Sequence, residues 1–285
     1  MKADRFILSL QIVMMIVAGL SCGRQNRSSA VPEDPGIHKI DSLEKAGYEI
    51  IDLHAHLKGG LTMEQLLDHS RITGIGYGVA VNCGFGFPIQ NDSSLSAYYH
   101  SVRDFSVYHA MQAEGREWTE MFSPDSIELF DYVFTDAMTY FDAEGRRTRL
   151  WIKEEVFIEE ADSFMDYYVA QIVEILNYEP IDIYVNPTFL PEQIAGRYDE
   201  LWTPDRMQKV ILALQENEIA LEINSRYKIP SAGFIKKAKE AGVRFTMGTN
   251  NGDNELGYLE YGLQMIEDCD LTPNDFWKPD GKLLQ

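Results

Sequence analysis

The feature that most limits the fold of this chain is a regular alternation of two sequence patterns after residue 48. Short runs rich in β-branched and aromatic residues alternate with longer stretches in which apolar residues recur at helical spacing. The runs predict strands at residues 49–53, 77–81, 116–120, 132–135, 182–185, 219–223 and 244–247. The stretches predict helices at residues 63–72, 95–112, 163–176, 205–215, 232–241 and 255–266, with a short turn at 126–129. Such alternation is typical of an α/β domain with a parallel sheet.

The residues after the first predicted strand decide between an open sheet and a closed one. An open doubly wound sheet usually carries a glycine-rich phosphate loop at this point. Here the strand runs into His54-Ala55-His56 instead. We therefore expect a single parallel (β/α)7-type barrel, a distorted TIM barrel, over residues 38–285.

Polar side chains are concentrated where the predicted strands end. The set is His54, His56, Asn82, Cys83, Glu117, Asp136, Asn186, Asn224, Asn250, Asn251 and Asp253. In a (β/α) barrel the carboxyl ends of all strands meet at one mouth. These side chains are therefore expected to line one pocket.

The two histidines are the strongest chemical signal in the set. Residues i and i+2 of a strand point to the same side, so both imidazoles can reach one ion. Imidazole is a good ligand for zinc, iron and manganese. Without a metal, His54 and His56 would simply fill a polar pocket. The other histidines predict no ligand, because His100 and His109 fall on a predicted helix and His38 and His69 are expected at the surface.

Several motifs together resemble the polymerase and histidinol phosphatase superfamily. They are Ile51-Asp52-Leu53-His54-Ala55-His56, Gly115-Arg116-Glu117, Asp131-Tyr132-Val133-Phe134-Thr135, Leu221-Glu222-Ile223-Asn224, and the segments around Gly248-Thr249 and Leu256-Gly257. The match covers roughly residues 48–277, and only His-x-His is specific by itself. The resemblance implies a seven-stranded barrel that hydrolyses phosphate esters with a trinuclear metal site.

The chain departs from the superfamily pattern at most of the metal ligands. His54, His56 and Glu117 match, whereas Asn82-Cys83, Asn186 and Asn250-Asn251 stand where the family has histidine or aspartate. Neutral amides cannot offset the charge of clustered dications. The resemblance therefore implies a reduced site of one or two zinc, manganese or iron ions, or none.

In this reduced site the metal ligands are His54, His56 and Glu117, and Cys83, Asp136 and Asp253 are possible further ligands. Glu117, Asp136 and Asp253 are the candidate catalytic residues, and the amides Asn82, Asn186, Asn224, Asn250 and Asn251 line the pocket. With so few metal ions, a phosphate ester would need cationic help. The candidate cations are Arg146, Arg147, Arg226 and Lys228.

The N-terminus has the pattern of an export signal. Lys2 and Arg5 precede an apolar run at residues 6–20, which is too short for a comfortable membrane span. The run ends in Gly19-Leu20-Ser21-Cys22, which resembles a bacterial lipobox. We expect residues 1–21 to be a lipoprotein signal peptide, Cys22 to be lipidated and residues 22–37 to be a flexible tether. Ordinary cleavage after Ser21 is the alternative. The expected location is the bacterial cell envelope, on the periplasmic or surface side.

The charge of the chain limits its partners. Its formal net charge is −20, and Arg146, Arg147 and Arg149 form a short basic cluster of three residues. Phosphate backbones would be repelled, so nucleic acid is not an expected partner. A small phosphorylated or carbohydrate-like substrate is expected instead. Aromatic residues that could line the mouth for a sugar are Phe85, Phe87, Trp118, Trp151 and Trp202.

Three functions remain open from the sequence. The first is a metal-dependent hydrolase, a phosphoesterase with a reduced site. The second is an inactive barrel that binds a ligand or partner at the cell surface. The third is an amidohydrolase, which residues 54–61 also resemble, but such enzymes need further histidines and none follows His109.

Overall fold

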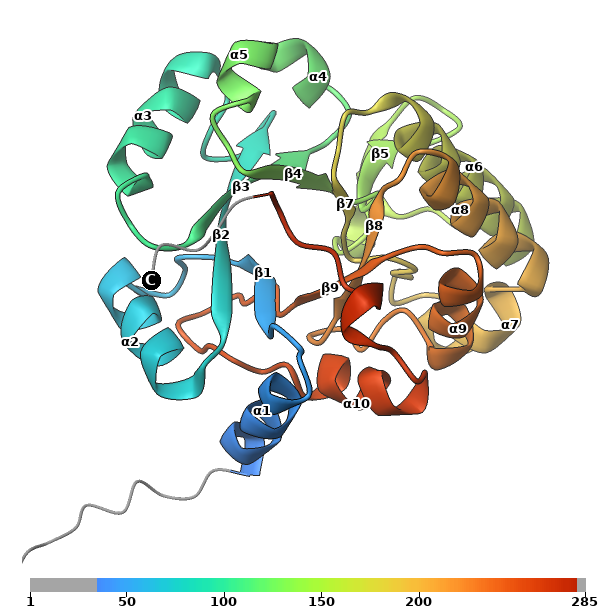
Figure 1. The fold of residues 1–285 in the computed structure, drawn as a ribbon. Helices are drawn as coiled ribbons and strands as arrows, with labels where there is room; N and C mark the ends of the chain where they lie inside the picture. The colour runs from blue at the N-terminus through green and yellow to red at the C-terminus, as the bar shows by residue number, and fades with distance from the viewer. Residues whose placement is uncertain (1–34, 281–285) are drawn as a thin grey trace, which may run out of the picture. The chain divides into compact units, whose positions relative to one another are not determined.

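The computed structural model describes residues 35–280 of the chain, and these residues form one α/β unit around a closed barrel (Figure 1). Seven parallel strands close in the order β1-β2-β3-β4-β7-β8-β9. The predicted parallel barrel is confirmed. Its strands are β1 (Ile51–Ala55), β2 (Gly76–Gly84), β3 (Tyr108–Glu114), β4 (Tyr132–Thr135), β7 (Ile183–Tyr184), β8 (Ala220–Asn224) and β9 (Phe245–Gly248).

Helices cover the outside of the ring of strands (Figure 1). They are α1 (Pro35–Lys45), α2 (Met63–Thr73), α3 (Asp92–Val102), α4 (Trp118–Met121), α5 (Pro124–Ile127), α6 (Ala161–Tyr178), α7 (Tyr198–Leu201), α8 (Pro204–Glu216), α9 (Ala232–Glu240) and α10 (Glu260–Asp268). Side chains of Thr62, Asn91, Thr203 and Ser231 cap the N-termini of α2, α3, α8 and α9.

The third strand is the main difference from the prediction. Residues 95–112 were expected to be one helix, but α3 ends at Val102 and β3 begins at Tyr108. Every residue of β3 is buried, so the strand shows no clear alternation of polar and apolar residues. The expected strand at 116–120 is wrong, because the short helix α4 lies there.

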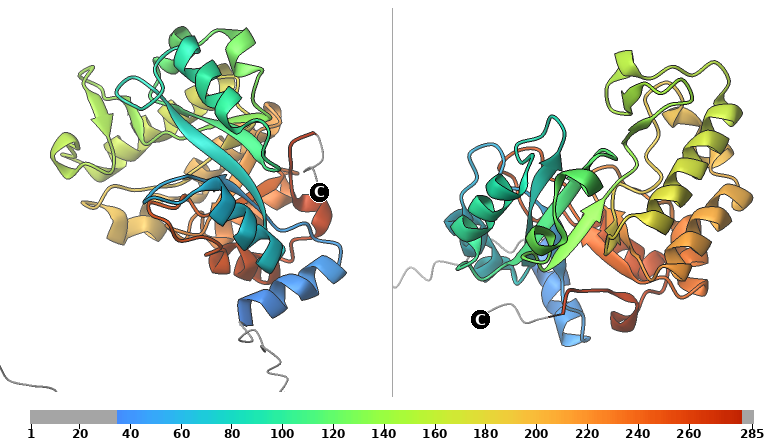
Figure 2. Two further views of the ribbon diagram at one scale, coloured as in Figure 1. Left: turned by 90° about the vertical axis from the view of Figure 1, so that its left-hand side faces the viewer. Right: turned by 90° about the horizontal axis from the view of Figure 1, so that it is seen from above.

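A two-stranded hairpin follows β4 and was not predicted. It consists of β5 (Thr139–Phe141) and β6 (Arg147–Arg149), which pair antiparallel and stand apart from the barrel (Figure 2). Its three-residue strands are too short for a sequence pattern to detect. The expected basic cluster Arg146, Arg147 and Arg149 lies on this hairpin.

Helix α1 begins at Pro35, so the last three residues of the predicted tether are helical. Proline favours the first turn of a helix, because its missing N–H has no partner there in any case. The predicted signal peptide and Cys22 lie outside the described residues. Among residues 35–280, no helix has the length and apolar character required to cross a membrane.

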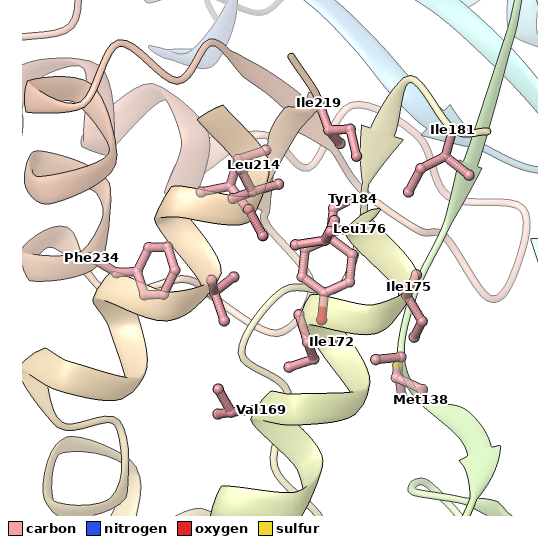
Figure 3. Packing of buried hydrophobic residues seen from close by; sticks show 14 of the residues in the cluster. Met138, Val169, Ile172, Ile175, Leu176, Ile181, Tyr184, Leu214, Ile219 and Phe234 are labelled. Atoms are coloured by element: carbon pink, nitrogen blue, oxygen red, sulfur yellow. The ribbon is translucent and has the colours of Figure 1, made fainter. Parts of the chain in front are cut away.

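The largest hydrophobic cluster lies between the barrel and the helices that follow β4. Figure 3 shows side chains of α6, α8, α9 and β7 meeting in it, among them Ile172, Tyr184 and Leu214. A separate cluster, with members from β1, β2, β3, β4, β7 and β8, fills the inside of the ring. The Tyr132 hydroxyl crosses this interior and donates a hydrogen bond to the Leu53 carbonyl at 2.7 Å. The lower barrel is therefore packed, and only its mouth is polar.

Ile172→Ala should lower the free energy of unfolding by about 2–5 kcal/mol, because it leaves a cavity in the largest cluster. Ile172 is fully buried on α6, whereas Ile72 on α2 is 67% exposed. Ile72→Ala is the matched control and should change stability by less than about 0.5 kcal/mol. Urea unfolding followed by circular dichroism measures both. Equal effects of the two substitutions would contradict the packing described here.

Candidate functional site

The site begins with His54 and His56 at the end of β1. The pairing of β1 with β2 shifts register between Asp52 and Ala55, and such an irregularity can re-aim a side chain. The carboxylate of Asp52 accepts hydrogen bonds from the backbone N–H groups of His54 and Thr249, each at 3.1 Å, and from the Thr249 hydroxyl at 2.5 Å. These contacts join the end of β1 to the residue after β9.

Both imidazoles are buried. In each ring, one nitrogen takes part in a hydrogen bond and the other has no hydrogen-bond partner among the described residues. Nδ1 of His54 lies 2.6 Å from Oε1 of Glu222, and Nδ1 of His56 lies 3.0 Å from the Ala80 carbonyl oxygen. Both partners are acceptors, so Nδ1 carries the proton in each ring. Within residues 35–280, Nε2 of each ring is buried and has no hydrogen-bond partner. Burial, together with the nearby positive charge of Lys58, lowers the pKa of His56 and favours its neutral form.

Glu222 on β8 holds the first imidazole in place. Its Oε2 accepts hydrogen bonds from the Asn186 backbone N–H at 2.6 Å and from Asn224 Nδ2 at 3.0 Å. Gly248 makes this approach possible, because a Cβ there would lie 2.0 Å from Glu222 Oε1 and 2.7 Å from His54 Cβ. A histidine whose second nitrogen is fixed by a carboxylate is the usual arrangement behind a metal ligand.

A second buried carboxyl group, Glu114, stands at the end of β3. Its Oε1 accepts a hydrogen bond from Asn82 Nδ2 at 2.7 Å, and the same amide donates to Gln112 Oε1 at 2.8 Å. Burial, and next the negative charge of Asp136, raise the pKa of Glu114 to about 8. A carboxyl group that keeps its proton near neutral pH can act as a general acid.

Glu117 is not at the end of a strand, contrary to expectation. It precedes α4 and forms an ion pair with Arg147 of the hairpin, with 3.4 Å between Glu117 Oε1 and Arg147 Nε. Its other oxygen accepts the Arg116 backbone N–H at 3.0 Å. Glu114, three residues earlier, is the carboxylate at the end of β3. The role of Glu117 as a ligand stays a prediction.

Asp136 and three of the predicted amides form one hydrogen-bonded network. Asn186 Nδ2 donates to Asp136 Oδ2 at 2.8 Å, and Asn186 Oδ1 accepts from Asn224 Nδ2 at 3.0 Å and from Asn250 Nδ2 at 2.9 Å. All four side chains are buried. Burial raises the pKa of Asp136, and the hydrogen bond from Asn186 opposes the rise. These amides therefore satisfy one another's hydrogen-bonding groups.

The remaining predicted residues have other contacts. Asn251 bonds to both the N–H and the carbonyl of His56, at 2.7 and 2.9 Å, so it positions the backbone. Asp253 is exposed, and its Oδ1 accepts the Glu255 N–H at 3.0 Å. Cys83 lies within β2, packs in the largest hydrophobic cluster and donates to the Val81 carbonyl. Burial raises the pKa of its thiol, which disfavours the thiolate that a metal would need.

Some side chains that were considered for the mouth or the surface belong to the core. Trp118 and Trp202 are fully buried, and their indole N–H groups donate to Glu179 and to the Thr188 carbonyl. His109 was expected on a helix but lies on β3, where its Nε2 bonds to the Val102 carbonyl oxygen at 2.9 Å. His69 is half-buried, and its Nδ1 lies 2.9 Å from the Tyr77 hydroxyl.

The donor atoms fit an ion at the two imidazoles better than a cluster of ions. The two free Nε2 atoms are an observation in favour, because a buried polar atom without a partner costs about 1–3 kcal/mol. Across residues 35–280, however, no three histidine, cysteine or acidic side chains gather into a metal-binding group as they stand. A carboxylate side chain would have to turn toward His54 and His56 to complete a set of three metal ligands.

Sequence reasoning gave no role to Glu222 and did not name Glu114. Glu222 stood in the motif Leu221-Glu222-Ile223-Asn224 without an assigned contact. Glu114 could have been found from the period-two spacing of Gln112 and Glu114, because alternate residues of a strand share one face. That signal was hidden while the segment was assigned to a helix.

Metal-free protein should become less stable as pH rises from about 4.5 to about 8. The folded chain holds the Glu114 proton more tightly than the unfolded chain does. The contribution of Glu114 to the free energy of unfolding is therefore complete below the unfolded pKa of about 4.5, and it is lost as pH rises toward the folded pKa of about 8. Glu114→Gln should flatten this slope in urea-unfolding free energies. Exposed Glu128 supplies the control Glu128→Gln, which should keep the slope. An unchanged slope in Glu114→Gln would contradict the buried, proton-holding carboxyl group.

Comparison with known proteins adds one finding on the fold. No protein-family model matches the chain, and no curated protein matches it. Among solved structures, it is similar to histidinol phosphate phosphatase from Lactococcus lactis, which was solved with zinc, L-histidinol and phosphate. The TM-score is 0.56 at 13% identity, over 78% of this chain and 94% of the phosphatase. The chain therefore shares the barrel fold of this solved phosphatase.

Proposed function

We propose that this protein is a metal-dependent hydrolase that cleaves a small phosphate ester. The observation that carries the proposal is the pair of free, buried Nε2 atoms on His54 and His56. Both rings are held in the tautomer that leaves a lone pair on Nε2. The solved phosphatase with a similar fold binds zinc and phosphate, which supports the same class of chemistry here.

His54 and His56 would hold the ion, with Asp136, which interacts electrostatically with His54, as a candidate third ligand. A divalent metal bound there supplies Lewis acidity toward a phosphoryl oxygen. Residues of the chain orient the two imidazoles and supply a proton. Glu222 orients His54, and Asn251 fixes the backbone of His56. Glu114 can hold a proton for a leaving group.

The amide network supports a second candidate function, a barrel that binds a ligand without catalysis. Asn186, Asn224 and Asn250 already satisfy one another, and such a neutral network can exist without metal. Metal content separates the two candidates. A metal-free protein with chelator-insensitive ligand binding would favour the second.

Protein prepared without added metal should carry about one tightly bound divalent ion per chain by elemental analysis. His54→Ala should abolish both the bound metal and the hydrolysis of p-nitrophenyl phosphate, because it removes a ligand. Glu222→Gln should weaken metal binding by roughly 10- to 100-fold, because it alters the contact that orients His54. His100→Ala, on the exposed face of α3, is the control and should change neither. Chelator-insensitive turnover that persists in His54→Ala would rule out the metal mechanism.

We also propose that the protein is exported and anchored to a bacterial membrane through Cys22. The apolar run that ends in Gly19-Leu20-Ser21-Cys22 supports this. Full-length protein expressed in a bacterial host should fractionate with membranes, and Cys22→Ser should release it as soluble protein. Cys83→Ser is the control, because that thiol is buried in the domain and should not affect fractionation. A Cys22→Ser protein that stays membrane-bound would exclude the lipid anchor.

A further inference from the structure

Two large aromatic side chains of β4 lie inside the barrel and lead to His54. Tyr132 and Phe134 are alternate residues of this strand, so both point to the same face of the sheet. Both are buried, and both belong to the cluster that fills the inside of the ring of strands. Their ring centroids are 5.9 Å apart, and the angle between the ring planes is 26°. The two rings therefore form a short stack within the barrel.

Phe134 is the member of the stack that contacts the candidate metal site. Its ring centroid lies 4.6 Å from that of the His54 imidazole, and the two planes are tilted by 57°. Aromatic rings at such separations attract each other and prefer a tilted or offset arrangement. Two other side chains adjoin the same imidazole. Glu222 Oε1 lies 2.6 Å from Nδ1, and the ring centroid of His56 is 5.2 Å away. Phe134, Glu222 and His56 together limit the tilt of the His54 ring.

The hydroxyl group of Tyr132 joins the stack to the backbone that carries His54. It donates a hydrogen bond to the carbonyl of Leu53, the residue directly before His54, at 2.7 Å. Gly78 on β2 leaves room for this contact, because a Cβ there would lie 1.9 Å from the hydroxyl oxygen. The stack therefore reaches His54 in two ways, through the Phe134 ring and through the carbonyl that precedes it in the chain.

The C-terminal segment supports the stack from the opposite end of the barrel. The ring of Trp277 packs edge-on against Tyr132, with 6.0 Å between the ring centroids. The backbone N–H of Trp277 donates to the Phe245 carbonyl at 2.8 Å. Phe245 is the first residue of β9, so this contact lies at the end of the barrel away from the mouth. Trp277 thus prevents the stack from moving away from His54.

We propose that Phe134 and Tyr132 are positioning residues for His54. Their stack holds the imidazole at the tilt at which Nδ1 meets Glu222 and Nε2 is left without a partner within residues 35–280, available to a metal ion. The consequence for metal binding rests on the proposed hydrolase function, whereas the hold on the ring does not. Core packing alone would give a different result, because any equally buried ring would then have the same effect on His54 when it is replaced.

The hold on the ring is tested by NMR of metal-free protein that carries ¹⁵N-labelled histidine. The proton on Nδ1 of His54 is buried and hydrogen-bonded, so it should exchange slowly with water, and its absence in His54→Ala assigns the signal. Phe134→Leu should speed this exchange by roughly tenfold or more, because it removes a ring that limits local opening.

Phe234→Leu is the matched control for this measurement. Phe234 is as fully buried as Phe134, but it lies on α9 and packs against Trp202. Its replacement should lower stability and leave the exchange rate of the His54 proton unchanged. Unchanged exchange in Phe134→Leu, or an equal acceleration in Phe234→Leu, would overturn the proposal.

Tyr132→Phe tests the same support with a smaller change to the core, and it decides the question if Phe134→Leu does not fold. It keeps the ring and removes only the hydrogen bond to the Leu53 carbonyl. Exchange of the His54 proton should become roughly two- to tenfold faster, the equivalent of one hydrogen bond. Tyr184→Phe is the control, because the Tyr184 hydroxyl has no hydrogen-bond partner within residues 35–280. Equal exchange rates in these two variants would overturn the proposal.

Metal binding is tested with Co²⁺ alone, whose visible absorption changes when imidazole nitrogens coordinate it. Phe134→Leu should weaken Co²⁺ binding by roughly tenfold, because it loosens a ligand without removing it, and Phe234→Leu should keep the affinity. Equal affinities in Phe134→Leu and the unsubstituted protein would reject the positioning role and retain the hydrolase. Failure of the unsubstituted protein to bind Co²⁺ would reject the hydrolase instead, and the exchange rates in metal-free protein would still decide whether the stack holds His54.

Discussion

The mouth of this barrel depends on one buried contact, between Glu222 and His54. Glu222 accepts hydrogen bonds from the ring of His54, the backbone of Asn186 and the side chain of Asn224, so it joins the ends of β1, β7 and β8. A buried carboxylate is costly unless it is fully bonded, and losing one of its partners typically costs about 3–5 kcal/mol. The absence of a side chain at Gly248 is what lets the two groups meet.

The amides explain how these strand ends can remain ordered with few or no metal ions. Histidine and aspartate ligands crowded at one mouth repel or remain unpaired until cations neutralise them. In this chain Asn186, Asn224 and Asn250 donate to carboxylate or amide oxygens, and each hydrogen bond is internal. The two free Nε2 atoms of His54 and His56 are the part of the mouth that is left for a ligand.

The fold could be predicted where patterns are long and regular. Helices α2, α6, α8 and α9 agree with their predicted ranges to within about two residues at each end, the precision usual for sequence patterns. The third strand was missed, because β3 is buried throughout and its period of two is marked only by Gln112 and Glu114 near its end. The wrong range for this strand also changed the predicted site residue, since it placed Glu117 rather than Glu114 at the strand end. Short elements such as β5 and β6 depend on their partners and left no readable signal.

The sequence by itself determined the class of fold and the two histidines, because alternation of strands with helices and His-x-His spacing are local properties. It also predicted asparagine side chains at the ends of several strands, and Asn186, Asn224 and Asn250 meet there in one hydrogen-bonded network. Only the tertiary structure decided which carboxylate meets His54. Glu222 lies 168 residues from His54, and Arg226 reaches the mouth through a loop that follows another strand. Contacts across such separations are set by closure of the barrel, which brings every strand end to one place whatever its distance along the chain.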